Sequence, residues 1–168
     1  MNPITMVFVG IVFVLFVISG VVAGISLLHG SEAGTFVQDV TTIQGAVNKV
    51  FGVQGNYSGV SSNCGSGTAN PQCVIPEALQ ASTPIGGTFN VQSGGAGLPN
   101  YEYEVEVSGV NLSASICKQI VSQVDTVSTL VDGTAVGNAN NTPTGSQAQS
   151  ACGSGGVTSL GFVFSNGQ

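Results

Sequence analysis

Four cysteines are the residues of this chain whose chemistry is most constrained by their surroundings. Cys64, Cys73, Cys117 and Cys152 lie in stretches rich in Gly, Ser and Asn, and the single histidine, His29, is far from them in sequence. Outside the cytoplasm such a set forms two disulfides, whereas inside it the set would point towards metal. The distance to His29 favours disulfides. Four cysteines allow three pairings, and we predict that each pairs with its nearer neighbour, giving Cys64–Cys73 and Cys117–Cys152.

Few other side chains could build a reactive site. The chain has two lysines, one histidine and eight carboxylates, and the sequence contains no nucleophile–base pair, phosphate-binding loop or metal-ligand spacing. Glu102, Glu104 and Glu106 could hold a calcium ion, but their alternation with apolar residues favours the solvated face of a strand. His29 could be a pH-sensitive contact, or simply a polar residue at the end of the apolar segment described below. We therefore expect no enzyme activity, no catalytic or metal site and no cofactor.

The overall charge excludes one class of partner. Charged residues make up 6% of the 168 residues, and the formal net charge is −6, whereas an average soluble domain has roughly 25% charged residues. Because such a surface repels phosphates, we expect no direct binding to nucleic acid.

An apolar segment dominates the N-terminal part of the chain. Residues 6–28 contain no ionisable side chain, and the first basic residue is Lys49. As a helix these residues would be about 35 Å long, enough to span a bilayer core. Signal sequences and membrane anchors normally carry basic flanking residues, and their absence here needs an explanation.

The helical pattern continues beyond the apolar segment and turns amphipathic. Apolar residues recur at steps of four and three, with polar residues on the opposite face; they are Phe36, Val40, Ile43, Val47 and Val50. We predict one helix from about residue 4 to Phe51. Its glycines have two G-x-x-x-G spacings, Gly20 to Gly24 and Gly30 to Gly34. These allow either close helix packing or local unwinding, because glycine weakens a helix.

The remainder of the chain predicts an α+β fold. A turn-rich loop follows Gly52, and strands are expected within residues 86–95, 101–109 and 157–168. Residues 111–131 have helical spacing, with Asn111 or Ser113 as N-cap, and residues 133–156 are polar and of low complexity. We thus expect a long N-terminal helix with an apolar first half, packed on a C-terminal antiparallel sheet domain. The expected division is a helix over 1–52 and a globular domain over 53–168, with a loop at 53–85 and a disulfide-bounded region at 117–152.

This order of elements resembles the type IV pilins, in particular the type IVb group that includes toxin-coregulated pilins and PilS-type thin pilins. The stretches that carry the resemblance are "IQGAVNKVFGVQGNYSG", "VSGVNLSASICKQIVSQV" and "CGSGGVTSLGFVFSNG". Type IV pilins are made with a short basic leader that a prepilin peptidase removes immediately before the apolar segment. The resemblance therefore implies that Met1 is the processed N-terminus, a position that the family often methylates, and that the missing basic flank belonged to the leader.

The resemblance also implies what the apolar segment does. The chain is expected to be the major subunit of an extracellular pilus filament and to be a bitopic inner-membrane protein before assembly. Its expected partners are further copies of itself, the inner membrane, the prepilin peptidase and the pilus assembly machinery. The residues expected in the filament core are Thr5, Phe8, Phe13, Phe16, Gly20 and Gly24. Thr5 stands where the family usually has a glutamate. The alternatives are a minor pilin, a secretion pseudopilin, or a membrane-anchored surface binding domain that does not polymerise.

Overall fold

The structure of the chain is a computed structural model that describes residues 32–60, 73–93, 98–137, 142–153 and 156–165. The chain divides into two units, of which the second, Ala33–Gln168, contains all the elements discussed below. The apolar segment lies outside the described residues. Among the described helices, none has the length and apolar character needed to cross a membrane.

The first helix is described over residues 32–51. Its buried side chains follow the predicted stripe and are Ala33, Phe36, Val40, Ile43 and Val47. Val50 was expected in the same stripe, but it is 50% exposed. The core at this end of the helix is filled instead by Tyr57, which is fully buried and donates a hydrogen bond from its hydroxyl to Asn48 Oδ1, 3.2 Å away.

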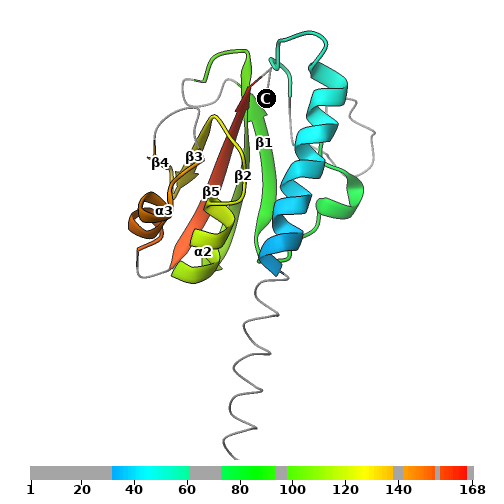
Figure 1. The fold of residues 1–168 in the computed structure, drawn as a ribbon. Helices are drawn as coiled ribbons and strands as arrows, with labels where there is room; N and C mark the ends of the chain where they lie inside the picture. The colour runs from blue at the N-terminus through cyan, green and yellow to red at the C-terminus, as the bar shows by residue number, and fades with distance from the viewer. Residues whose placement is uncertain (1–31, 61–72, 94–97, 138–141, 154–155, 166–168) are drawn as a thin grey trace, which may run out of the picture. The chain divides into compact units, whose positions relative to one another are not determined.

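A five-stranded antiparallel sheet forms the centre of this unit, with the strand order β1-β2-β5-β3-β4. The strands are β1 (Thr88–Ser93), β2 (Glu102–Leu112), β3 (Ser128–Val131), β4 (Thr134–Val136) and β5 (Val157–Ser165). A helix followed by an antiparallel sheet is the arrangement that the sequence predicted, and the predicted α+β class is confirmed. The strand that ends the described chain lies in the middle of the sheet, between β2 and β3 (Figure 1).

The core lies between one face of this sheet and the first helix. On β5 the residues Leu160, Phe162 and Phe164 are buried on one face, as their alternation predicted. The Phe36 ring from the first helix stacks on Phe89 of β1 at a centroid distance of 5.4 Å and lies 6.1 Å from Phe162. Aromatic pairs at such separations add about 0.5–1.5 kcal/mol beyond burial of their area. The helix is thus fixed against β1 and β5 by ring contacts.

The region after β2 differs in part from the sequence prediction. Helix α2 spans only Ala114–Val121, with Ser113 as its N-cap, because β2 extends to Leu112 and β3 begins at Ser128. The polar, low-complexity stretch 133–156, for which the sequence predicted no helix or strand, contains β4 and helix α3 (Gly145–Cys152). A capping box formed by Thr144 and Gln147 starts α3, and such caps stabilise short helices of low apolar content. A short 3-10 helix, η1, spans Glu77–Leu79.

Candidate assembly surfaces

The residues predicted to form the filament core all lie outside the described residues. They are Thr5, Phe8, Phe13, Phe16, Gly20 and Gly24, and Met1, the predicted processed N-terminus, lies outside the described residues too. His29 lies outside them as well. The surfaces that the structure does describe belong to the first helix, the sheet, and the pair of helices α2 and α3.

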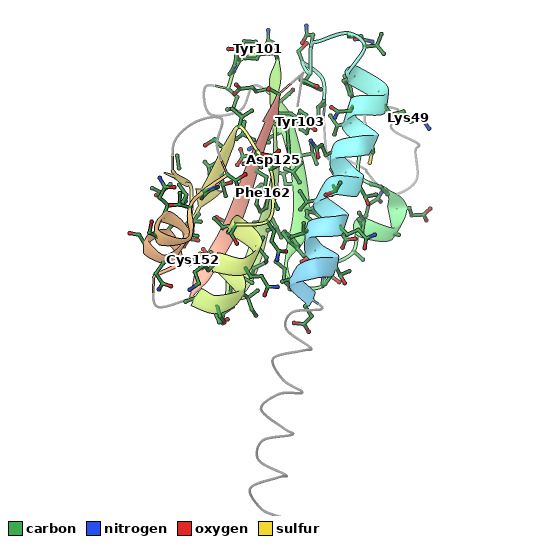
Figure 2. All side chains as sticks on the ribbon, viewed as in Figure 1. Lys49, Tyr101, Tyr103, Asp125, Cys152 and Phe162 are labelled. Atoms are coloured by element: carbon green, nitrogen blue, oxygen red, sulfur yellow. A yellow bond between two sulfur atoms is a disulfide. The ribbon has the colours of Figure 1, made fainter. Side chains whose placement is uncertain are left out.

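A disulfide joins α2 to α3. Cys117 and Cys152, one of the two predicted pairs, are bonded with their Cα atoms 5.8 Å apart and both are buried. Beside them the Lys118 ammonium donates a hydrogen bond to Gln149 Oε1 at 2.6 Å. Figure 2 shows Cys152 on the side of the sheet where α3 lies. Cys73 is disulfide-bonded as well, and its predicted partner Cys64 lies outside the described residues.

The row of glutamates on β2 is not uniformly solvated, contrary to the sequence prediction. Glu104 is only 9% exposed, while Glu102 and Glu106 are half-buried. Its carboxylate accepts a hydrogen bond from Gln92 Nε2 on β1 at 3.2 Å. Burial raises the pKa of Glu104, the Gln92 hydrogen bond opposes this rise, and the charge on Glu106 adds to it. The alternation correctly predicted which face of β2 carries Glu104, but it did not predict how deeply Glu104 is buried. The burial is possible because Gly161 on β5 leaves room for the Glu104 carboxyl.

Tyr101 was expected on the buried face of the same strand, but it is 57% exposed. It precedes the strand, which begins at Glu102. The buried row on β2 consists of Tyr103, Val105 and Val107. An alternating pattern at the end of a strand does not show how far the pairing extends.

The β3–β4 hairpin places an aspartate in an unusual backbone conformation. Asp132 has a φ of 47° and Gly133 a φ of 74°, which corresponds to a two-residue turn with both central residues left-handed. Asp132 Oδ1 accepts hydrogen bonds from the amides of Thr158 and Ser159, at 2.8 and 2.9 Å, and from the Thr158 hydroxyl at 2.8 Å. Asp132 is exposed. Desolvation by its neighbours raises the pKa of Asp132, but these three donors outweigh it and lower the pKa below its ordinary value. The carboxylate is therefore ionised at neutral pH.

A groove of about 530 Å³ lies between this hairpin and α3. Asp132, Thr134 and Ala135 line it from the hairpin, and Gln147 and Ser150 line it from the helix. Asp132 is the charged group of this lining. The groove can accept a polar or cationic side chain, because its walls carry hydroxyl, amide and carboxylate oxygens.

Sequence reasoning did not identify Asp132. The signal was present, because Asp-Gly between two residue runs of strand character is a strong indication of a two-residue hairpin. Because residues 133–156 are polar and of low complexity, the sequence analysis predicted neither the hairpin nor α3. In the part of the chain that the structure describes, no group of three or more His, Cys, Asp or Glu side chains could hold a metal ion.

The fold was compared with known proteins. No family model and no curated protein matches the sequence. Among solved structures, TcpA, a type IV pilin from Vibrio cholerae El Tor biotype, superposes with a TM-score of 0.58 at 17% identity, covering 80% of this chain and 99% of that chain. The major type IV pilin PilA1 from Clostridium difficile gives a TM-score of 0.51 at 14% identity, covering 82% of this chain and 97% of that one. A type IVb pilin from Salmonella typhi gives 0.48 at 20% identity, covering 82% and 99%.

The two superpositions with TM-scores above 0.5 cover 80% and 82% of this chain. The chain has a type IV pilin fold.

Proposed function

We propose that this chain is the major structural subunit of an extracellular type IV pilus filament of the type IVb group. The observation that carries the proposal is the order of its parts. Residues 6–28 are predominantly apolar, contain no ionisable side chain and are followed within a few residues by a helix that packs on a pilin-type sheet. A segment of this length and composition needs an apolar environment, either lipid or other helices. In a filament, neighbouring copies supply it.

The partners follow from this proposal. The chain would be a bitopic inner-membrane protein before assembly, processed by a prepilin peptidase and extracted by the pilus assembly machinery. Copies of the chain would then bundle their apolar helices, with Thr5, Phe8, Phe13, Phe16, Gly20 and Gly24 in the filament core. The low content of charged residues is compatible with dense packing of subunits. The proposal assigns no enzymatic step to the chain.

The test is to shear surface filaments from cells that express the chain and to examine them by electron microscopy and mass spectrometry. If the proposal is correct, the main protein of long thin filaments is this chain, with its N-terminus at Met1. A chain that occurs only at trace level in such filaments would be a minor pilin or a pseudopilin. A chain that stays in the membrane fraction and never enters filaments would be an anchored binding domain.

A further inference from the structure

In the groove between the β3–β4 hairpin and α3, the Asp132 carboxylate is held in a fixed orientation by hydrogen bonds. All three hydrogen bonds to Asp132 are made by Oδ1, and no described residue engages Oδ2. These donors fix the orientation of the carboxyl group and hold it ionised. A charged oxygen fixed in a hollow of this size is suited to receive a cationic side chain.

The chain has only two lysine or arginine side chains that could supply this cation. The Lys118 ammonium is bonded to Gln149 Oε1. Lys49, in the last turn of the first helix, is exposed and forms no hydrogen bond or ion pair with any residue that the structure describes. Figure 2 shows its side chain extending away from the sheet. Lys49 is therefore the free cation of the described surface.

Lys49 cannot reach Asp132 of its own copy. Near Lys49, Asn48 bonds to Tyr57, the Tyr57 ring packs on Tyr103, and Tyr103 packs on Phe164. This series of contacts places Lys49, in the first helix, near the end of β5 that contains Phe164. The Asp132 amide donates to the Ser159 carbonyl, which places Asp132 near the start of the same strand. Ser159 and Phe164 are five positions apart along β5, which corresponds to about 17 Å, more than the length of a lysine side chain.

The other seven carboxylates of the described residues are less suited to bind Lys49. Glu32, Glu77 and Glu102 form no side-chain hydrogen bond with a described residue that would fix their orientation. Glu104 is buried and bonded to Gln92. Glu106 accepts a hydrogen bond from Asn90, and Asp125 accepts one from Thr142. Burial raises the pKa of Asp39, which disfavours its charge. Asp132 differs from them because hydrogen bonds both fix it and lower its pKa.

We propose that Lys49 of one copy binds the Asp132 carboxylate in the hairpin–α3 groove of a second copy. This inference rests on the proposed function, because it assigns one contact between neighbouring subunits. One copy supplies the cation and the next copy supplies the carboxylate, so the contact can repeat head to tail along a filament as a heterologous interface. Such interfaces produce open helical polymers unless the rotation closes a ring. The attraction between Lys49 and Asp132 also offsets part of the repulsion between copies that each carry a net charge of −6.

The test compares three substitutions in the full chain, assembled in cells. Asp132→Asn keeps an Oδ1 acceptor for the amides of Thr158 and Ser159, and asparagine tolerates the left-handed backbone, so it removes the charge with little change to the turn. Lys49→Gln removes the cation. Lys118→Gln is the matched control, because it removes the other lysine without touching the proposed contact.

The measured quantity is the fraction of the subunit recovered in sheared filaments, normalised to the total subunit in the cells. We expect about a tenfold loss for Lys49→Gln and for Asp132→Asn, and little change for Lys118→Gln. The double variant Lys49→Gln/Asp132→Asn should be no worse than either single variant, because both remove the same interaction. Filament yields at the wild-type level for Lys49→Gln would overturn the inference, as would additive losses in the double variant.

A second measurement is independent of yield. Wild-type filaments treated with a zero-length carbodiimide cross-linker should contain a peptide in which Lys49 is joined to Asp132 between two subunits, and Asp132→Asn filaments should lack it. Cross-links from Lys49 only to other carboxylates would refute the contact while leaving the filament function intact. Cells that express the wild-type chain and make no filaments would overturn the proposed function and the contact with it.

Discussion

Tyr57 and Tyr103 lie side by side in the core with ring centroids 4.7 Å apart, but only one of their hydroxyls is hydrogen-bonded to a residue that the structure describes. The Tyr57 hydroxyl donates to Asn48 Oδ1. The Tyr103 hydroxyl is buried and has no partner among the described residues. Burial, together with the neighbouring Tyr57, raises the pKa of Tyr103. A buried hydroxyl without a partner costs about 1–3 kcal/mol of desolvation.

The two tyrosines should therefore respond in opposite ways to removal of the hydroxyl. We expect Tyr103→Phe to raise the free energy of unfolding by about 1 kcal/mol and Tyr57→Phe to lower it by about 1 kcal/mol. Urea unfolding of the full chain in mild detergent, followed by circular dichroism, measures both. A loss of stability in Tyr103→Phe would show that its hydroxyl has a partner in the folded protein.

The sequence predicted the elements whose apolar residues repeat with a clear period. The helix is confirmed over its described part, residues 32–51, and β1 and β5 lie where they were predicted. In these elements the apolar residues recur on one face, and Phe36 of the helix packs on Phe89 and Phe162 of the two strands. The hairpin and α3 were missed because backbone geometry and caps stabilise them. The turn at Asp132 and the capping box at Thr144 involve few apolar residues.

The sequence pattern also did not predict how deeply the side chains on each face are buried. Alternation placed Glu104 on the polar face of β2, but its burial depends on Gly161 in a strand more than 50 residues later. The groove at Asp132 likewise requires β4 and α3 to lie together. Such long-range juxtapositions are set by strand order, which a local period does not determine.

Gly161 should be intolerant of a side chain. A Cβ at this position would overlap the Glu104 carboxyl and press against Leu130 Cβ, so we expect Gly161→Ala to destabilise the fold by about 1–3 kcal/mol. Gly145→Ala is the matched control, because a Cβ there meets no atom within 4 Å. Comparable urea midpoints for the two variants would contradict the packing of Glu104 over Gly161.

The stability of the subunit should depend on pH through Glu104. Because the folded-state pKa of Glu104 lies above its ordinary value of 4.5, its contribution is fully present below that value and is lost as the pH rises through the folded pKa. Besides burial, the groups that act on the pKa of Glu104 are Gln92 and Glu106, and neither carries a positive charge. We expect the urea concentration at the unfolding midpoint to decrease as the pH is raised from 4.5 to 7.5.

Glu104→Gln should remove most of this pH dependence and stabilise the subunit at pH 7.5, since a neutral amide still accepts the Gln92 hydrogen bond. Glu77→Gln, in the exposed 3-10 helix η1, is the control and should leave the slope unchanged. Equal slopes for Glu104→Gln and the wild type would contradict this account.

The contribution of Asp132 to stability changes with pH in the opposite direction to that of Glu104. Its folded-state pKa lies below the ordinary value of 3.8, so its stabilising contribution is present above that value and is lost as the pH falls through the folded pKa. Asp132→Asn should therefore flatten the acid side of the stability profile below about pH 4. Urea midpoints of this variant and the wild type between pH 2 and 4 test this. A parallel decline in both would show that Asp132 does not contribute.

The Cys117–Cys152 bond should contribute strongly to stability. It closes a segment with a sequence separation of 35 residues, which is worth about 3–4 kcal/mol in the chain-entropy model. Cys117→Ser/Cys152→Ser should lower the unfolding free energy by about this amount and release α3, whose remaining side-chain link to α2 is Lys118 with Gln149. Hydrogen exchange over residues 145–152 reports the release. Unchanged protection there would count against a structural role of the bond.

The second predicted disulfide is tested by peptide mapping without reduction. Cys73 is disulfide-bonded, and we expect its partner to be Cys64. A mapped peptide that joins Cys73 to either of the other two cysteines would refute the nearest-neighbour pairing.

The central claim is that this chain polymerises through its apolar segment, and a reconstruction of its filaments by electron cryomicroscopy tests it most directly. We predict a filament of this chain alone, in which residues 6–28 of neighbouring copies pack together along the axis with Phe8, Phe13 and Phe16 in the core and the sheet domains outside. A filament with a different main subunit, or one whose core excludes residues 6–28 of this chain, would contradict the account.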